Sequence, residues 1–152
     1  MERSIVCGVD GSADSEAALA VATRLAERLD ARLVLANVVD HAHSPYAAAG
    51  GVGGLPPPPM PGAFEEQLRA GERFLEHIAE RAELDQAERR VLFGLPAERL
   101  ADLADEEDAE LIVVGSRGRG AFKAAFLGSV STSLIGIARC PVLVVPPGAK
   151  EP

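Results

Sequence analysis

The chain has 152 residues and a formal net charge of −8, with 47% hydrophobic but only 4% aromatic residues. This length fits a single domain that buries roughly two-thirds of the surface exposed by the unfolded chain. The acidic balance excludes nucleic acid and anionic membranes as general partners. A core of Ala, Val, Leu and Ile is typical of parallel sheets that are buried on both faces.

Aliphatic runs alternate with helical spacing from the start of the chain. Ile5–Val9 predicts a strand that ends at Asp10-Gly11-Ser12, and the apolar residues that follow recur at three and four positions, as in an amphipathic helix. Leu33–Val39 predicts a second strand. Residues 41–63 contain many Gly and Pro, almost no charge and no periodicity, which predicts a mobile loop.

The alternation continues through the second half of the chain. The predicted elements are a helix from Phe64, a strand at about Arg89–Phe93, a helix that begins at Pro96, a strand at Leu111–Val114, a helix at about Ser129–Arg139 and a strand at Val142–Val145. Strands that alternate with helices in this way indicate one α/β domain. Its sheet is parallel, its crossovers are right-handed and its helices cover both faces.

The segment LIVVGSRGRGAFKAAFLGSVS, residues 111–131, is the strongest functional signal. An aliphatic strand stops at Gly115, Gly118 follows, and Gly128-Ser129 opens a helix that Ser129 is expected to cap. Glycine leaves room for an anion beside backbone amides at such a helix start. Residues 111–150 hold five basic and no acidic residues, whereas the first 110 residues hold 22 acidic and 10 basic ones. This pattern predicts a site for a phosphorylated small molecule.

Several other signals are weaker or absent. Neither GxxxxGK[ST] nor GxGxxG is present where a nucleotide loop requires it. His41 and His43 lack carboxylate or Cys company, so no metal site is predicted. Cys7 and Cys140 are expected to be buried thiols. With no signal peptide and no run of about 18 apolar residues, a cytoplasmic protein is expected.

The spacing Gly115-x2-Gly118-x9-Gly128-Ser129 resembles the nucleotide loop of the universal stress protein family. VCGVDGSADSEAAL resembles the first strand and turn of that family, EDAELIVVGSRG its fourth strand and RCPVLVVP its last, so the resemblance covers residues 3–147. It implies a three-layer α/β sandwich of the Rossmann-like, adenine nucleotide hydrolase-like type. The implied five-stranded parallel sheet has the order 3-2-1-4-5. We expect the domain to span residues 1–147, with a C-terminal tail at 148–152.

The resemblance also assigns roles in the ATP-binding branch of the family. Asp10 would contact the adenosine part and face Gly115 across the crevice between strands 1 and 4. The backbone of Val38 would meet the adenine edge, and Ser131 would donate from the first turn of the helix. Val114 and Gly115 would line the base and ribose, whereas the amides of Gly118, Gly128, Ser129 and Val130 would hold the phosphates, with Arg117, Arg119 and Lys123 as candidate cations. The predicted nucleotide site comprises Gly8, Asp10, Val38, Val114, Gly115, Arg117, Gly118, Gly128, Ser129, Val130 and Ser131.

These roles imply a regulatory module that binds ATP, with or without Mg²⁺, and has no catalytic residue. The apolar strand Val142–Val145 is expected at the sheet edge, where the resemblance implies that it pairs two copies into a homodimer. A slow ATPase or an adenylating enzyme remains an alternative, because Asp14 or Glu16 approaches from the first turn. Asp10–Ser15 resembles the SGGxDS pyrophosphate loop of adenylating enzymes, although the Asp10 carboxylate would repel a pyrophosphate. A dimeric interaction protein with an unoccupied nucleotide pocket is the third possibility.

Overall fold

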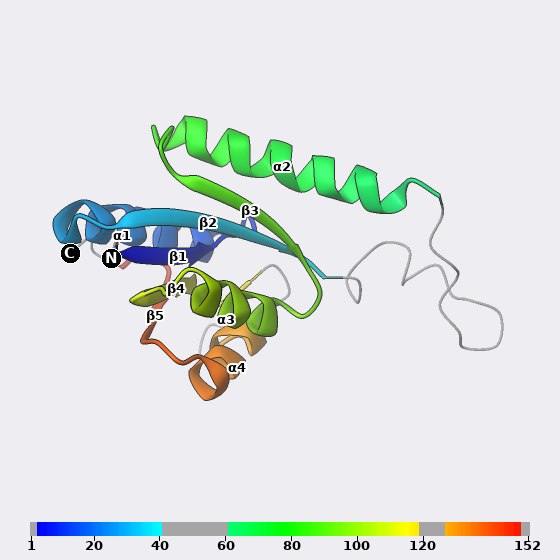
Figure 1. Cartoon of the computed structure of the whole chain (residues 1–152). Helices are drawn as coiled ribbons and strands as arrows, with labels where there is room; N and C mark the ends of the chain where they lie inside the picture. The colour runs from blue at the N-terminus through cyan, green and yellow to red at the C-terminus, as the bar shows by residue number, and fades with distance from the viewer. Residues whose placement is uncertain (1–2, 41–60, 119–126, 150–152) are drawn as a thin grey trace.

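A computed structural model of the chain describes residues 3–40, 61–118 and 127–149, in which strands and helices alternate as the sequence predicts (Figure 1). The elements are β1 (Ser4–Gly8), α1 (Ala13–Leu29), β2 (Arg32–Val39), α2 (Ala63–Arg81), β3 (Glu88–Phe93), α3 (Pro96–Glu106), β4 (Leu111–Gly115), α4 (Ser129–Ile137) and β5 (Val142–Val145). Helix α2 includes Ala63, the last residue of the predicted loop, and residues 41–60 of that loop lie outside the described residues.

The strands form a five-stranded parallel sheet in the order β3-β2-β1-β4-β5. The central strand β1 pairs with β2 and β4, so that Cys7 lies between Leu35 and Val113. This arrangement confirms the predicted order 3-2-1-4-5. It places β5 at one edge of the sheet and β3 at the other.

Helices cover both faces of the sheet, which makes three layers (Figure 1). Successive side chains of a strand point to opposite faces. Ile5 and Cys7 therefore pack with α1 and α2, whereas Val6 packs with α3 and α4. Among the described residues, the buried side chains of both cores are Ala, Val, Leu and Ile together with Cys7, as the composition predicts.

A ring of alternating charges lies at the amino ends of β2 and β3, opposite the carboxyl edge of the sheet. Arg32 pairs with Glu88 and, at 2.7 Å, with Glu107, and Arg90 pairs with Glu88 at 2.7 Å and with Glu107 at 2.5 Å. The hydrogen bond from Arg32 is the main reason why the pKa of Glu107 lies below its ordinary value. These ion pairs connect the end of α3 to β2 and β3. The sequence pattern did not predict them.

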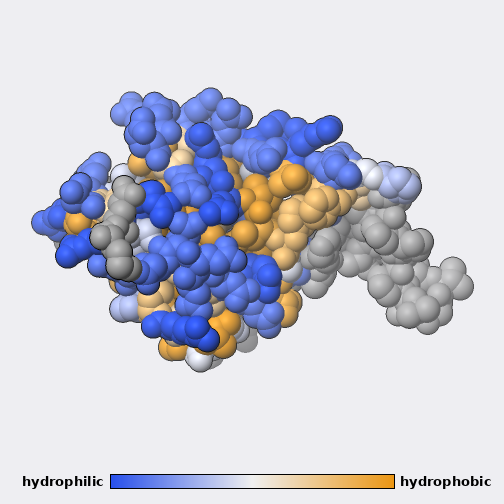
Figure 2. All heavy atoms as spheres, viewed as in Figure 1, coloured by the Kyte–Doolittle hydropathy of each residue, from blue (hydrophilic) through white to orange (hydrophobic). Residues whose placement is uncertain are grey.

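The surface is largely polar in the view of Figure 2, with an apolar area beneath α2 around the carboxyl end of β3. Phe64 at the start of α2 is 54% exposed, and its ring stacks on that of Phe93 with centroids 4.4 Å apart. Leu95, two residues beyond β3, is also exposed.

Candidate functional site

Successive strands are added on one side of β1 as far as β3, and the chain then crosses to the other side of β1 to form β4 and β5. The segments that follow β1 and β4 meet at the carboxyl edge, where Asp10 lies beside Gly118. Open α/β sheets bind ligands in the crevice at such a switch point. Here a Cβ added to Gly118 would lie 2.8 Å from Oδ2 of Asp10. Asp10 is therefore brought against Gly118. Gly115, which we expected opposite Asp10, instead packs on Asp14.

Asp10 has one carboxylate oxygen in a turn and the other beside the loop after β4. Its Oδ1 accepts a hydrogen bond from the amide of Ser12 at 2.9 Å, as in turns that an Asp side chain closes. Its Oδ2 is the atom that limits a side chain at Gly118. Asp10 thus closes the turn after β1 and also presents an acceptor to the crevice.

Side chains of the same segment accept hydrogen bonds from backbone amides at the amino terminus of α1. Ser12 is the N-cap, and its hydroxyl accepts from the amide of Ser15 at 3.2 Å. The carbonyl of Ser12 accepts from the amide of Glu16, and the amide of Asp10 donates to the hydroxyl of Ser15. Two acids, Asp14 and Glu16, lie in the first turn. The loop that resembles an adenylating pyrophosphate loop therefore uses these groups internally.

The amino terminus of α4 is different, and the expected cap is wrong. Gly128, not Ser129, is the N-cap residue, and it has no side-chain hydrogen bond to the helix. Ser129 is the first helical residue and is exposed. The amide of Gly128, which we expected to hold phosphate, donates to the carbonyl of Ser116 at 2.7 Å. A Cβ on Gly128 would lie 3.3 Å from that carbonyl oxygen, so glycine permits the chain before α4 to lie on the chain after β4.

The expected donor Ser131 is directed into the protein. Its side chain is 2% exposed, and its hydroxyl donates to the carbonyls of Ser116 and Gly128, both at 3.2 Å. Ser131 therefore pins the start of α4 to the end of β4, and its proton is engaged by backbone oxygens. The amides of Ser129 and Val130 lie in the first turn, where a helix supplies no acceptor.

Four other predicted residues serve packing between layers. A Cβ on Gly115 would lie 2.7 to 2.8 Å from backbone atoms and Cβ of Asp14, so the missing side chain lets α1 approach β4. A Cβ on Gly8 would lie 3.0 Å from Cδ1 of Leu100. The side chains of Val114 and Val38 pack in the core on the α3 side.

A largely buried cluster beside this crevice, formed by Asp14, Ser116 and Arg117, is not predicted by the sequence. The Ser116 hydroxyl donates to Oδ2 of Asp14 at 2.7 Å, and Nε of Arg117 lies 3.4 Å from the same oxygen. Asp14 is 7% exposed and Ser116 8%. The sequence signal was faint, because an acid in a first helical turn is usually a solvated helix-terminus residue. Among the other predicted cations, Arg119 and Lys123 lie outside the described residues, as do His41 and His43.

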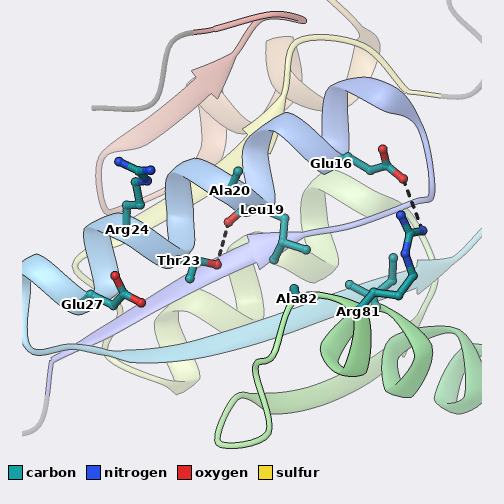
Figure 3. Close-up of a pocket in the computed structure, with 9 residues that line it drawn as sticks. Glu16, Leu19, Ala20, Thr23, Arg24, Glu27, Arg81 and Ala82 are labelled. Carbon is teal, nitrogen blue, oxygen red and sulfur yellow. Dashed lines mark hydrogen bonds and ion pairs between the residues drawn. The ribbon is translucent and has the colours of Figure 1, made fainter.

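A separate groove lies on the outer surface between α1 and α2, with a volume of about 420 Å³ (Figure 3). Glu16 and Arg81 approach to 3.9 Å across it, and the hydroxyl of Thr23 donates to the carbonyl of Leu19 within α1. The groove does not include Asp10 or the residues that follow β4. It is therefore distinct from the crevice at the carboxyl edge.

The thiols contribute no chemistry to the crevice. Cys7 is fully buried on β1, and burial raises its pKa to about 12. Cys140 is only half-buried, and burial raises its pKa as well. Both are free thiols. Within the described residues, no group of three or more His, Cys, Asp or Glu side chains is placed to hold a metal ion, and no helix is long and apolar enough to span a bilayer.

Known proteins resemble this chain both in sequence and in fold. The model of the universal stress protein family matches residues 1–146. The universal stress protein in the QAH/OAS sulfhydrylase 3′ region of Thermus aquaticus is 34% identical over 145 residues, which cover 95% of this chain and 99% of the relative.

Two solved structures extend the comparison. The universal stress protein UspA from Lactobacillus plantarum has a TM-score of 0.72 at 22% identity, with 94% of this chain and 97% of that chain covered. A universal stress protein solved in complex with cAMP has a TM-score of 0.64 at 26% identity, with 96% and 98% covered. The chain belongs to the universal stress protein family.

Proposed function

We propose that this protein is a regulatory module that binds an adenine nucleotide, that the nucleotide is ATP, and that its phosphates lie at the amino terminus of α4. The observation that carries the proposal is the contrast between the two helices that begin at the crevice. Helix α1 is capped by Ser12 and has acids in its first turn, whereas α4 has no side-chain cap among the described residues and no acid in its first turn. An uncapped helix start favours anions through its free amides and its dipole.

The other residues at the crevice fit the remaining parts of an adenine nucleotide. Asp10 is an acceptor for ribose hydroxyls, and Gly118 leaves the space beside it free of a side chain. The first-turn amides of Ser129 and Val130 are the proposed phosphate donors, with Arg117 as the nearby cation. A relative that was solved with cAMP supports an adenine nucleotide as the class of ligand.

The contacts of the two acids near the crevice support binding over catalysis. Asp14, which would favour an enzyme if it reached the phosphates, is paired with Ser116 and Arg117. Glu16 lies toward Arg81 of α2, 3.9 Å away. Hydrolysis needs a positioned water and charge stabilisation at the transition state, whereas backbone amides alone bind the ground state equally well. We therefore propose a nucleotide-holding module rather than an ATPase.

We also propose that the module acts as a homodimer through β5. This strand lies at the sheet edge: β4 pairs with it on one side, and no described strand pairs with it on the other. Its residues Val142, Leu143 and Val144 are half-buried. Ile135 and Ile137 on neighbouring α4 are 59% and 47% exposed. An apolar, uncharged edge strand is usually paired or covered.

The test is a direct measurement of nucleotide binding. Protein purified without added nucleotide is denatured, and released ligand is identified by chromatography. Calorimetric titration of nucleotide-free protein with ATP, ADP, AMP, cAMP and adenosine, each with and without Mg²⁺, then ranks the ligands. We expect ATP to bind and Gly118→Val to abolish that binding, because a branched side chain would fill the space beside Oδ2 of Asp10.

Gly136→Val is the matched control, because a Cβ at that position meets no atom within 4 Å. It should keep the ATP affinity of the wild-type protein. The proposal fails if the wild-type protein binds no adenine nucleotide. The proposed placement of the phosphates fails if folded Gly118→Val binds ATP as the wild-type protein does.

A further inference from the structure

Arg117 is held by a buried carboxylate at the point where the proposed phosphate site begins. Its Nε lies 3.4 Å from Oδ2 of Asp14, and the two side chains are 22% and 9% exposed. An arginine bound through Nε keeps its two terminal NH₂ groups for a second acceptor.

We infer that Asp14 is a positioning residue of the nucleotide site: it orients Arg117 so that the terminal NH₂ groups bind the phosphates. This inference rests on the proposed nucleotide function. It assigns Asp14 a role through Arg117 and no contact with the nucleotide.

The backbone around Arg117 supports this role. Arg117 immediately precedes Gly118, and a Cβ on Gly128 would lie 3.3 Å from the Cα of Arg117. The backbone of Arg117 thus lies beside both glycines, Gly118 and Gly128, that border the proposed phosphate site. Fixing its side chain before binding lowers the conformational entropy that the ligand must otherwise remove.

Asp14 is itself held in place by three features. It lies in the first turn of α1, where the helix dipole favours a carboxylate. The Ser116 hydroxyl donates to its Oδ2 at 2.7 Å. The absent side chain of Gly115 lets the backbone of Asp14 lie against β4. A carboxylate that is held from three sides can impose a direction on the arginine that it binds.

Two simpler roles for Asp14 make different predictions. If Asp14 only ties α1 to β4, its loss changes stability but not the preference for phosphorylated ligands. If its charge only repels phosphate, its loss strengthens ATP binding, and that gain persists when Arg117 is neutral. A positioning role requires that the effect of Asp14 on ATP depends on Arg117.

The experiment is a double-mutant cycle on the full chain with Asp14→Asn, Arg117→Gln and the double variant, each titrated with ATP and with adenosine. Asparagine retains an oxygen that accepts from Ser116 but removes the charge. We expect Asp14→Asn to weaken ATP binding by about fivefold, to leave adenosine binding unchanged, and to have no effect on ATP in the Arg117→Gln background. Asp102→Asn, which breaks the exposed pair with Arg99, is the matched control and should bind both ligands as the wild-type protein does.

A further variant keeps the test decisive if Asp14→Asn does not fold. Arg117→Lys keeps the charge but has a single ammonium group, which cannot serve Asp14 and a phosphate with separate nitrogens. It should weaken ATP binding by a similar factor and spare adenosine.

The inference is overturned if Asp14→Asn leaves ATP binding unchanged or strengthens it, if its effect persists beside Arg117→Gln, or if Arg117→Lys binds ATP like the wild-type protein. Each of these results leaves the proposed nucleotide function intact, because the wild-type protein still binds ATP. A wild-type protein that binds neither ATP nor adenosine overturns both.

Discussion

Gly115→Ala should destabilise the fold, because helix α1 occupies the space that a side chain at this position would need. A Cβ there would lie 2.7 Å from the carbonyl carbon of Asp14 and 2.8 Å from its oxygen and its Cβ. Backbone atoms of a helix cannot rotate away as the end of a side chain can. The substitution therefore forces the first turn of α1 away from β4.

The expected magnitude follows from these distances. Non-bonded carbon atoms prefer separations of about 3.5 to 4.0 Å, so α1 must retreat by roughly 0.8 Å or more, or the strand must distort. Overpacking of a tight interior costs about 1 to 3 kcal/mol, and the loss of glycine flexibility in the unfolded chain returns part of that cost. We expect a net loss of about 2 kcal/mol in the free energy of unfolding, which lowers Tm by about 4 to 8 °C for a chain of this length.

Urea unfolding followed by circular dichroism measures this loss, since the chain contains no Trp for fluorescence. Gly136→Ala is the matched control: the residue lies within α4, and a Cβ there meets no atom within 4 Å. Alanine should be neutral there or stabilise the helix by up to about 1 kcal/mol. A loss below about 0.5 kcal/mol for Gly115→Ala, or an equal loss at both glycines, would refute the packing argument.

Three further predictions concern turnover, assembly and pH. Phosphate release from ATP with Mg²⁺ should stay far below one per second, the scale of working enzymes, and Asp10→Ala should not change it; turnover near one per second would contradict the binding role. Light scattering at micromolar concentration should give a dimer mass, and monomer alone would argue against pairing through β5. Glu107→Gln should cost about 2 kcal/mol at pH 7. Because Arg32 lowers the pKa of Glu107, that carboxylate stabilises the fold above its ordinary pKa and loses this effect as pH falls through the folded value. The difference in unfolding free energy between the wild-type protein and Glu107→Gln should therefore shrink below about pH 4. A difference that stays constant with pH would contradict a stabilising role for the ion pairs of Glu107.

The sequence alone determined the elements of this fold, because their signals are local. Apolar spacing located every strand and helix to within a few residues, and the glycine pattern of residues 115–128 identified the loop between β4 and α4. The strand order was not readable from periodicity. It came from the resemblance to the universal stress protein family, and the structure confirms it.

The contacts of the residues between β4 and the start of α4 became visible only in the folded chain. Ser131 and Ser129 look equivalent in sequence, yet the Ser131 hydroxyl is buried against backbone carbonyls while Ser129 is exposed. The sequence predicts Arg117 as a site residue but gives no sign of its partner Asp14, which lies 103 residues earlier in the chain. Likewise, only the folded chain shows that α1 packs against Gly115, where a Cβ would meet backbone atoms of Asp14. The reason is that periodicity reports which face of an element is buried. Periodicity does not report which atoms a polar group or a glycine contacts. Those contacts depend on how elements that are distant in sequence pack together.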